Sequence, residues 1–147
     1  MQERIGSLIK KSYLRIEKRF IQALQPYGLT PAQYRVMVLL CRNQDKPLRQ
    51  IDIEQEFGMT NPTVTGILQN MEKKDLVQRV ENPADRRSKL VSATPKTLAI
   101  VEKVEGEVEQ IEKYMATLFE PGERDELARL LKILNHDDCG KGGCDHE

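Results

Sequence analysis

The sequence contains few of the residues on which enzyme active sites and disulfide-rich folds depend. Only two of its 147 residues are histidines and three are cysteines, and both histidines follow residue 135. The body of the chain therefore offers no histidine for acid–base catalysis, and it carries neither a nucleophile motif nor a glycine-rich phosphate loop. We expect no enzymatic activity.

Membrane and secretion signals are missing as well. No apolar run is long enough to cross a bilayer, and the start, Met1 to Arg4, leads into an amphipathic pattern rather than a signal peptide. An odd number of cysteines does not suit a disulfide framework, so we expect a cytoplasmic protein. Cys41 lies in an apolar run, which favours a buried, inert thiol over a reactive one.

The chain also lacks net charge, with 23 basic and 23 acidic residues. A neutral total does not indicate nucleic-acid binding, but the charges are unevenly distributed. The first helical stretch is basic and the last ones are acidic. This pattern permits a basic face on one side of the molecule and an acidic scaffold on the other. At this length, we expect a single domain with a proper core.

Two short helical patterns around Gly58 indicate a helix–turn–helix, because glycine suits the tight turn between them. Thr60 is a good cap for the second helix, and Pro62 falls in its first turn. One side of this helix is apolar, with Val64, Ile67, Leu68 and Met71 at spacings of three and four. Its other residues are small or carry amides and are mostly uncharged, which suits contact with base edges. The candidate reading residues are Thr60, Asn61, Pro62, Thr63, Thr65, Gly66, Gln69 and Asn70.

Two β-like runs follow, residues 76–80 and 89–93, and a turn-rich loop with adjacent arginines separates them. A hairpin with a basic tip behind a helix–turn–helix predicts a winged helix–turn–helix. A guanidinium fits the narrow minor groove of A·T-rich DNA well. Lysines and an arginine nearby are candidates for phosphate contacts: Lys73, Lys74, Arg79 and Lys89. The alternative is a solvated loop of mixed charge.

In this ordered set of features, the sequence resembles the MarR family of bacterial transcription regulators. The resemblance covers roughly residues 5–134, and it rests on Leu29-Thr30-Pro31, residues 60–65, residues 71–77 and the wing, 85–96. It implies that Arg86 or Arg87 enters the minor groove while Asp85 holds the wing by pairing with an arginine. It also implies a mainly α fold with a small β-hairpin wing, and regulation by a small aromatic effector.

The sequence departs from the family pattern at two positions. Arg49 stands where the family usually has a serine or threonine helix cap, and Asp75 stands where it usually has the glycine that ends the recognition helix. We expect Asp75 to adopt the same left-handed conformation at a small cost in stability. Gly66 is compatible with close approach to DNA or with plain tolerance of glycine.

Long amphipathic patterns flank the winged region at both ends, over residues 3–25, 95–119 and 127–134. The second has a heptad-like seam, and such a seam requires a partner helix. The partner could be an internal bundle, but the family resemblance favours a twofold homodimer. The candidate dimerisation residues are Ile5, Leu8, Ile9, Ile16, Val108, Ile111, Met115, Leu127, Leu130, Leu131 and Leu134.

The C-terminal tail, residues 136–147, is rich in glycine, cysteine and histidine. His136, Cys139, Cys144 and His146 are borderline-soft ligands of the kind that zinc prefers. The Cys-x4-Cys spacing is looser than in structural zinc sites, so a flexible terminus is the alternative.

These observations predict a sequence-specific DNA-binding regulator, most simply a repressor, that acts as a homodimer on a near-palindromic operator. Its dimerisation region would comprise residues 1–28 and 95–135, and its winged region residues 29–94. Two other hypotheses are a metal- or thiol-responsive regulator that uses the tail, and a winged helix used only for protein contacts.

Overall fold

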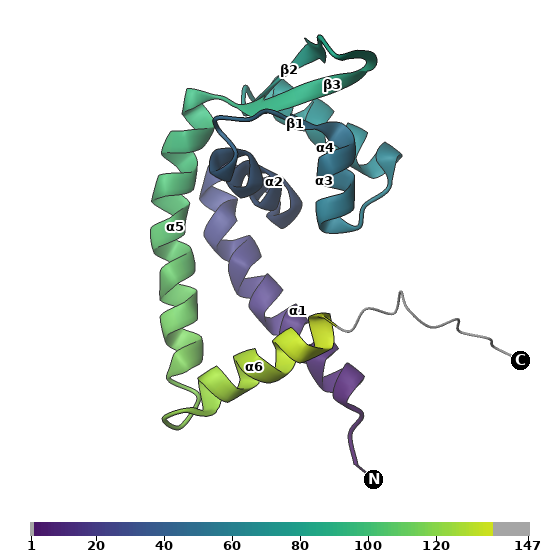
Figure 1. Ribbon diagram of the computed structural model, residues 1–147. Helices are drawn as coiled ribbons and strands as arrows, with labels where there is room; N and C mark the ends of the chain where they lie inside the picture. Colours follow the sequence, from purple (N-terminus) through teal and green to yellow (C-terminus); the bar gives the residue numbers. More distant parts are fainter. Residues whose placement is uncertain (1, 137–147) are drawn as a thin grey trace, which may run out of the picture. The chain divides into compact units, whose positions relative to one another are not determined.

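The computed structural model describes residues 2–136, and within them the fold is mainly helical with one small antiparallel sheet (Figure 1). The elements, in chain order, are α1 (Ile5–Leu24), the 3-10 helix η1 (Gln25–Tyr27), α2 (Pro31–Arg42), β1 (Leu48–Arg49), α3 (Gln50–Phe57), α4 (Asn61–Lys73), β2 (Val77–Asn82), β3 (Asp85–Ala93), α5 (Pro95–Ala116) and α6 (Glu123–Asn135). The chain divides into two compact units, residues 1–109 and 110–147. The first contains the complete winged helix–turn–helix.

Local side chains and glycines set the limits of the helices. Thr30 and Gln33 form a reciprocal cap at the start of α2, where each side chain bonds the other residue's backbone N–H at 3.2 Å. Gly28 and Gly58 end η1 and α3 with φ values of 65° and 61°, a conformation that glycine adopts without strain. Thr60 occupies the cap position of α4 as expected, but its side chain caps no backbone N–H. Its hydroxyl instead contacts that of Thr63 at 2.9 Å.

The sheet has the strand order β1-β3-β2, and all its pairings are antiparallel. Leu48 pairs with Val91, so the short strand before α3 joins the base of the wing. The wing strands are longer than predicted. Pairing continues to Asn82 and Asp85, so only Pro83 and Ala84 lie between the strands. Asn82 accepts the N–H of Ala84 at 3.0 Å, which closes the turn locally.

The core lies where α2, α3, α4, α5 and the sheet meet. The apolar side of α4 is buried as predicted, with Val64, Leu68 and Met71 fully inaccessible. They pack in one cluster with buried residues of the other elements, among them Leu24, Val36, Met37, Leu40, Ile53, Leu76, Val91 and Val104. This packing holds the recognition-type helix rigidly while its opposite side faces solvent.

Several polar bonds hold the end of α4. Asp75 has φ of +60°, so it adopts the left-handed conformation expected at this position. Thr94 and Thr97, from the start of α5, donate hydroxyl bonds to the carbonyls of Asp75 and Leu76 at 2.7 and 2.5 Å. Lys96 reaches the Lys74 carbonyl at 2.7 Å. The exit of the recognition helix is thereby attached to the first turn of α5.

The flanking helices are partly covered by this chain and partly bare. In α5, Val104 is buried, and Val101 and Val108 pack against the core, so this chain itself covers the first half of the predicted seam. The helix ends at Ala116 rather than Phe119, because residues 117–119 form turns. Large apolar side chains of α1 and α6 stay exposed, including Ile5, Leu8, Ile9, Ile16, Leu127, Leu130, Leu131 and Leu134.

Three further expectations concern the thiol, the membrane and the tail. Cys41 is half-buried, and burial raises the pKa of its thiol, which fits the inert interpretation. No helix among the described residues could span a membrane. Of the tail, Cys139, Cys144 and His146 lie outside the described residues. Within residues 2–136, no cluster of three or more His, Cys, Asp or Glu side chains could hold a metal ion.

Candidate nucleic-acid interface

The exposed side of α4 carries the reading residues that the sequence suggests. Asn61, Pro62, Thr63, Gln69 and Asn70 are exposed, and Thr65 and Gly66 are half-buried. A Cβ added at Gly66 would meet nothing within 4 Å, so space inside the chain does not require a glycine there. The side chains present amide and hydroxyl groups, the donors and acceptors that match base edges in a major groove.

Two of these residues are bonded to α3, the helix that packs against α4. Gln50 donates its amide N–H to the hydroxyl of Thr65 at 2.8 Å. One turn further along α3, Glu54 accepts a longer bond of 3.4 Å from the amide of Asn61. Two acids of α3, Asp52 and Glu56, argue against entry of this helix into a DNA groove, because phosphates would repel them.

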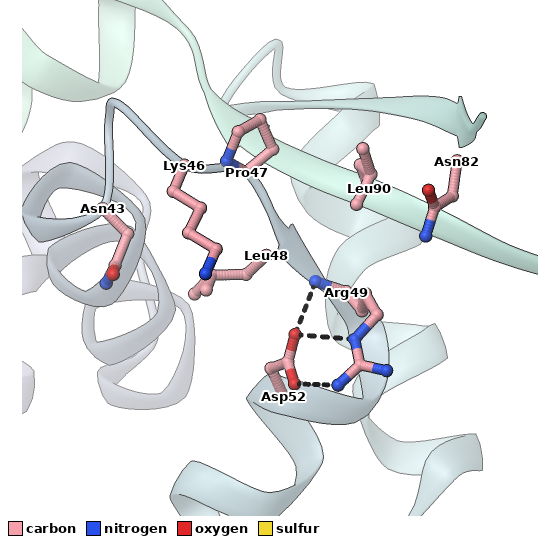
Figure 2. A pocket seen from close by; sticks show the side chains of 8 residues that line it. All are labelled: Asn43, Lys46, Pro47, Leu48, Arg49, Asp52, Asn82 and Leu90. Atoms are coloured by element: carbon pink, nitrogen blue, oxygen red, sulfur yellow. Dashed lines mark hydrogen bonds and ion pairs between the residues drawn. The ribbon is translucent and has the colours of Figure 1, made fainter. Parts of the chain in front are cut away.

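The structure weakens that objection for Asp52. Its carboxylate accepts both Nε and Nη2 of Arg49, at 3.2 and 2.8 Å, and the Arg49 backbone N–H at 2.9 Å (Figure 2). The bonds from Arg49 lower the pKa of Asp52. The aspartate therefore satisfies the N–H of the cap residue, as the third helical residue of a capping box does, whereas the Arg49 side chain itself accepts no backbone N–H. Arg49 still occupies the cap position, and the helix begins at Gln50.

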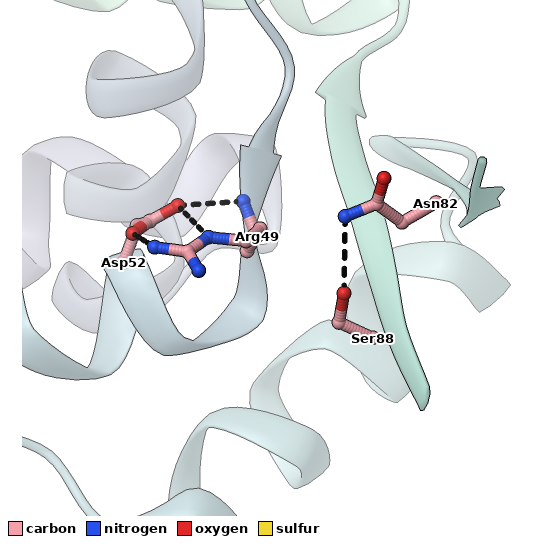
Figure 3. A network of polar contacts seen from close by, with 4 residues as sticks. All are labelled: Arg49, Asp52, Asn82 and Ser88. Atoms are coloured by element: carbon pink, nitrogen blue, oxygen red, sulfur yellow. Dashed lines mark hydrogen bonds and ion pairs between the residues drawn. The ribbon is translucent and has the colours of Figure 1, made fainter. Parts of the chain in front are cut away.

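The wing tip is built by local bonds between side chains and backbone. Asp85 accepts the N–H of Arg87 at 3.0 Å. Asn82 donates its amide N–H to the hydroxyl of Ser88 at 3.1 Å (Figure 3). Within residues 2–136 Asp85 forms no ion pair with an arginine side chain; its carboxylate bonds the main chain two residues ahead, and its charge contributes to the raised pKa of Arg49, behind the larger effect of Asp52. Arg86 and Arg87 are exposed, and within residues 2–136 neither guanidinium has a partner.

The four candidate phosphate contacts differ in availability. Lys73 and Lys89 are exposed, and their ammonium groups have no partner in the part of the chain that the structure describes. Lys74 donates to the Gly28 carbonyl at 2.6 Å and to Gln33 at 3.3 Å, and Arg79 pairs with Glu72 and is largely buried. Lys73 and Lys89 are therefore free to bind a phosphate, whereas Lys74 and Arg79 make intramolecular contacts that stabilise the fold.

An open groove of about 600 Å³ runs beside the base of the wing. Its lining comes from the α2–β1 turn, the start of α3 and the wing strands: Asn43, Lys46, Pro47, Leu48, Arg49, Asp52, Asn82 and Leu90 (Figure 2). Two cations, Lys46 and Arg49, lie on this groove, and Asp52 neutralises one of them. Their position between wing and helix could not be foreseen from the sequence, since it depends on the pairing of β1 with β3.

Comparisons with known proteins agree with this geometry. A MarR family model matches residues 27–88. The transcriptional repressor NicR of Pseudomonas putida is 28% identical over 141 residues, which cover 95% of this chain and 87% of that protein. Two solved structures superpose well. BpsR of Bordetella bronchiseptica, studied for its regulation by 6-hydroxynicotinic acid, has 29% identity and a TM-score of 0.81 over 92% of this chain and 96% of its own.

The second is the repressor CouR bound to a 23-mer DNA duplex, with 28% identity and a TM-score of 0.83 over 90% of this chain and 92% of that chain. Family model, curated relative and solved structures thus indicate the same fold and the same class of protein. The chain belongs to the MarR family of winged helix–turn–helix DNA-binding transcription regulators, which are not enzymes.

Proposed function

We propose that this protein represses transcription as a homodimer, that its operator is near-palindromic, and that a small aromatic acid releases it. The observation that carries the proposal is the pairing of an uncharged reading surface on α4 with two unpartnered, exposed arginines at the wing tip. A dimer would place two such surfaces in successive major grooves, about 34 Å apart.

Phosphate neutralisation would make the affinity depend on salt. The test is the double variant Arg86→Ala with Arg87→Ala, measured by fluorescence anisotropy on a promoter fragment at several salt concentrations. We expect weaker binding and a shallower salt dependence, because each arginine that no longer neutralises phosphate charge at the DNA surface lowers the slope of log K against log salt by roughly 0.9. The matched control is Lys10→Ala with Lys103→Ala, which removes two exposed cations from other helices. Unchanged DNA binding by the wing variant at low salt would contradict the proposed role of the wing.

The exposed apolar side chains of α1 and α6 support the homodimer. Ile5 is 73% exposed and Leu130 49% exposed in the isolated chain. A soluble protein rarely leaves so many large apolar groups in water, and a second copy of the same chain would cover them. Leu130→Asp together with Leu134→Asp should convert a dimer into a monomer in sedimentation experiments. A wild-type chain that sediments as a monomer at micromolar concentration would overturn this part of the proposal.

A depression of about 220 Å³ between α1, α2 and α3 is the candidate effector site. It is lined by Phe20, Tyr34, Arg35, Val38, Leu39, Arg42, Glu56 and Phe57. Aromatic rings offer stacking surfaces, and a guanidinium offers a partner for a carboxylate. Arg35 is already paired with Glu17 at 2.9 Å, whereas Arg42 has no partner among the described residues. Arg42 is therefore the residue that we assign to the effector carboxylate.

Such a ligand can regulate DNA binding only if it prefers the arrangement that does not fit DNA. The depression joins α1 to α3, the helix that contacts α4, so a ligand there can act on the position of the reading surface. We expect 6-hydroxynicotinic acid, or another single-ring aromatic acid from a small panel, to weaken operator binding. Arg42→Met should abolish this response and leave DNA affinity without ligand unchanged. A response that survives in Arg42→Met would place the site elsewhere.

A further inference from the structure

The start of α3 lies against the reading surface, and local hydrogen bonds and strand pairing hold it there. Three bonds between Arg49 and Asp52 fix the residue immediately before Gln50 (Figure 3). The preceding residue, Leu48, is paired with Val91 in β3. The pairing with the wing and the bonds at the helix start therefore fix where the backbone of Gln50 lies.

From this position the Gln50 amide reaches α4. Its N–H donates to the Thr65 hydroxyl at 2.8 Å, a favourable hydrogen-bond distance, and both residues are half-buried. A hydroxyl has one proton to donate and lone pairs to accept. In the part of the chain described by the structure, the Thr65 proton has no acceptor. The bond from Gln50 therefore occupies one of the two lone pairs of the hydroxyl and leaves its proton free to donate.

We propose that Gln50 is a positioning residue for sequence recognition, which acts by holding the Thr65 hydroxyl as a donor toward DNA. This inference rests on the proposed function, and it assigns a role to a residue outside the recognition helix. A fixed donor suits an acceptor on a base edge, such as purine N7, guanine O6 or thymine O4. The N4 amino group of cytosine is itself a donor, so it would compete with the Gln50 amide for the lone pairs of the hydroxyl and leave the Thr65 proton without an acceptor.

A specific signature distinguishes this role from a purely structural one. If Gln50 only stabilised the packing of α3 on α4, its loss would weaken binding to every DNA equally. If it orients a donor, its loss frees the Thr65 hydroxyl to rotate and accept as well as donate. The variant should then tolerate cytosine at a position of the half-site where the wild type rejects it.

The experiment begins with selection of duplexes from a random DNA library by the purified full-length protein. Wild type, Gln50→Met, Thr65→Val and the double variant are then compared by anisotropy on the selected duplex and on a shuffled duplex of equal length. Methionine matches the length of glutamine and valine matches the shape of threonine, but both lack the hydrogen-bonding group. Thr65→Ser keeps the hydroxyl and serves as the control.

We expect Gln50→Met to lower affinity for the selected duplex about fivefold, the effect of one hydrogen bond, and to leave binding to the shuffled duplex unchanged. Because Gln50 acts through Thr65, the double variant should bind about as well as Thr65→Val alone. When the selection is repeated with Gln50→Met, cytosine should become enriched at one half-site position from which the wild type excludes it.

Four results would overturn the inference. Additive losses in the double variant would show that Gln50 acts independently of Thr65. Equal losses on selected and shuffled duplexes would assign Gln50 to packing. A wild-type selection that enriches no sequence would overturn both this inference and the proposed function, whereas enrichment of a sequence that Gln50→Met reads equally well would overturn the inference alone.

Discussion

The hydroxyl of Thr97 should contribute measurably to stability at the point where the recognition helix passes into the wing. Thr97 is fully buried, and its hydroxyl donates to the Leu76 carbonyl at 2.5 Å. Thr97→Val preserves the shape of the side chain and removes this bond. The carbonyl would keep one partner, the N–H of Thr94 at 3.3 Å. It would therefore not be left completely unsatisfied.

The expected loss of stability follows from the hydrogen bonds that the Leu76 carbonyl loses and keeps. One intramolecular hydrogen bond contributes about 1 kcal/mol net, whereas a carbonyl left without any partner would cost up to about 3 kcal/mol. Since the Thr94 bond remains, we expect Thr97→Val to lower the free energy of unfolding by about 1 kcal/mol. Thr97→Ser should lose about as much through the missing buried methyl group, at roughly 0.8 kcal/mol per methylene plus a small cavity term. Thr97→Ala combines both losses and should cost about 2 kcal/mol.

Urea denaturation of the four proteins at one fixed chain concentration measures these differences, because the stability of a dimer depends on concentration. The slope m should stay constant across the series if the surface exposed on unfolding does not change. The reasoning would be refuted if Thr97→Val were as stable as the wild type while Thr97→Ala were no less stable than Thr97→Ser. The hydroxyl would then contribute nothing.

Two other substitutions test separate parts of the structure. Gly66→Ala should raise the stability of α4 by up to about 1 kcal/mol, because an added Cβ meets no atom within 4 Å. If the variant loses operator affinity in anisotropy measurements, the glycine is needed for close approach to DNA. If the affinity is unchanged, the helix simply tolerates a glycine there. Asp52→Asn should destabilise the protein at neutral pH, because Arg49 lowers the pKa of Asp52 in the folded state. A carboxylate whose pKa is lowered on folding stabilises the folded state above its unfolded pKa. The difference in stability between wild type and Asp52→Asn should therefore disappear as pH falls below about 3.9. A difference in thermal melts that does not depend on pH would contradict the assigned ion pair.

Much of the winged fold can be predicted from the sequence, because its signals are local. The cap at Thr30, the turn at Gly58 and the left-handed Asp75 each depend on one residue and its neighbours. The buried side of α4 follows from helical periodicity alone. The wing strands were predicted too short, because strand pairing continues past a register shift after Glu81 to Asn82 and Asp85, inside the stretch whose composition resembles a loop.

The contacts between elements could not be predicted in this way. Nothing in the sequence indicates that Gln50 reaches Thr65 fifteen residues later, or that Lys74 is bonded to the Gly28 carbonyl. In the sequence, Asp52 indicates only repulsion of phosphates, because its bonds to the Arg49 guanidinium are made in the folded chain. Such bonds depend on how the helices cross, and periodicity does not determine the crossing.

The stoichiometry of the complex tests the central claim most directly. Sedimentation of a fluorescently labelled, selected duplex with increasing amounts of protein gives the number of chains that each duplex binds at saturation. We predict two chains per duplex, bound together over a site whose half-sites are about 10 base pairs apart. Saturation at one chain per duplex, or no complex in dilute buffer, would contradict it.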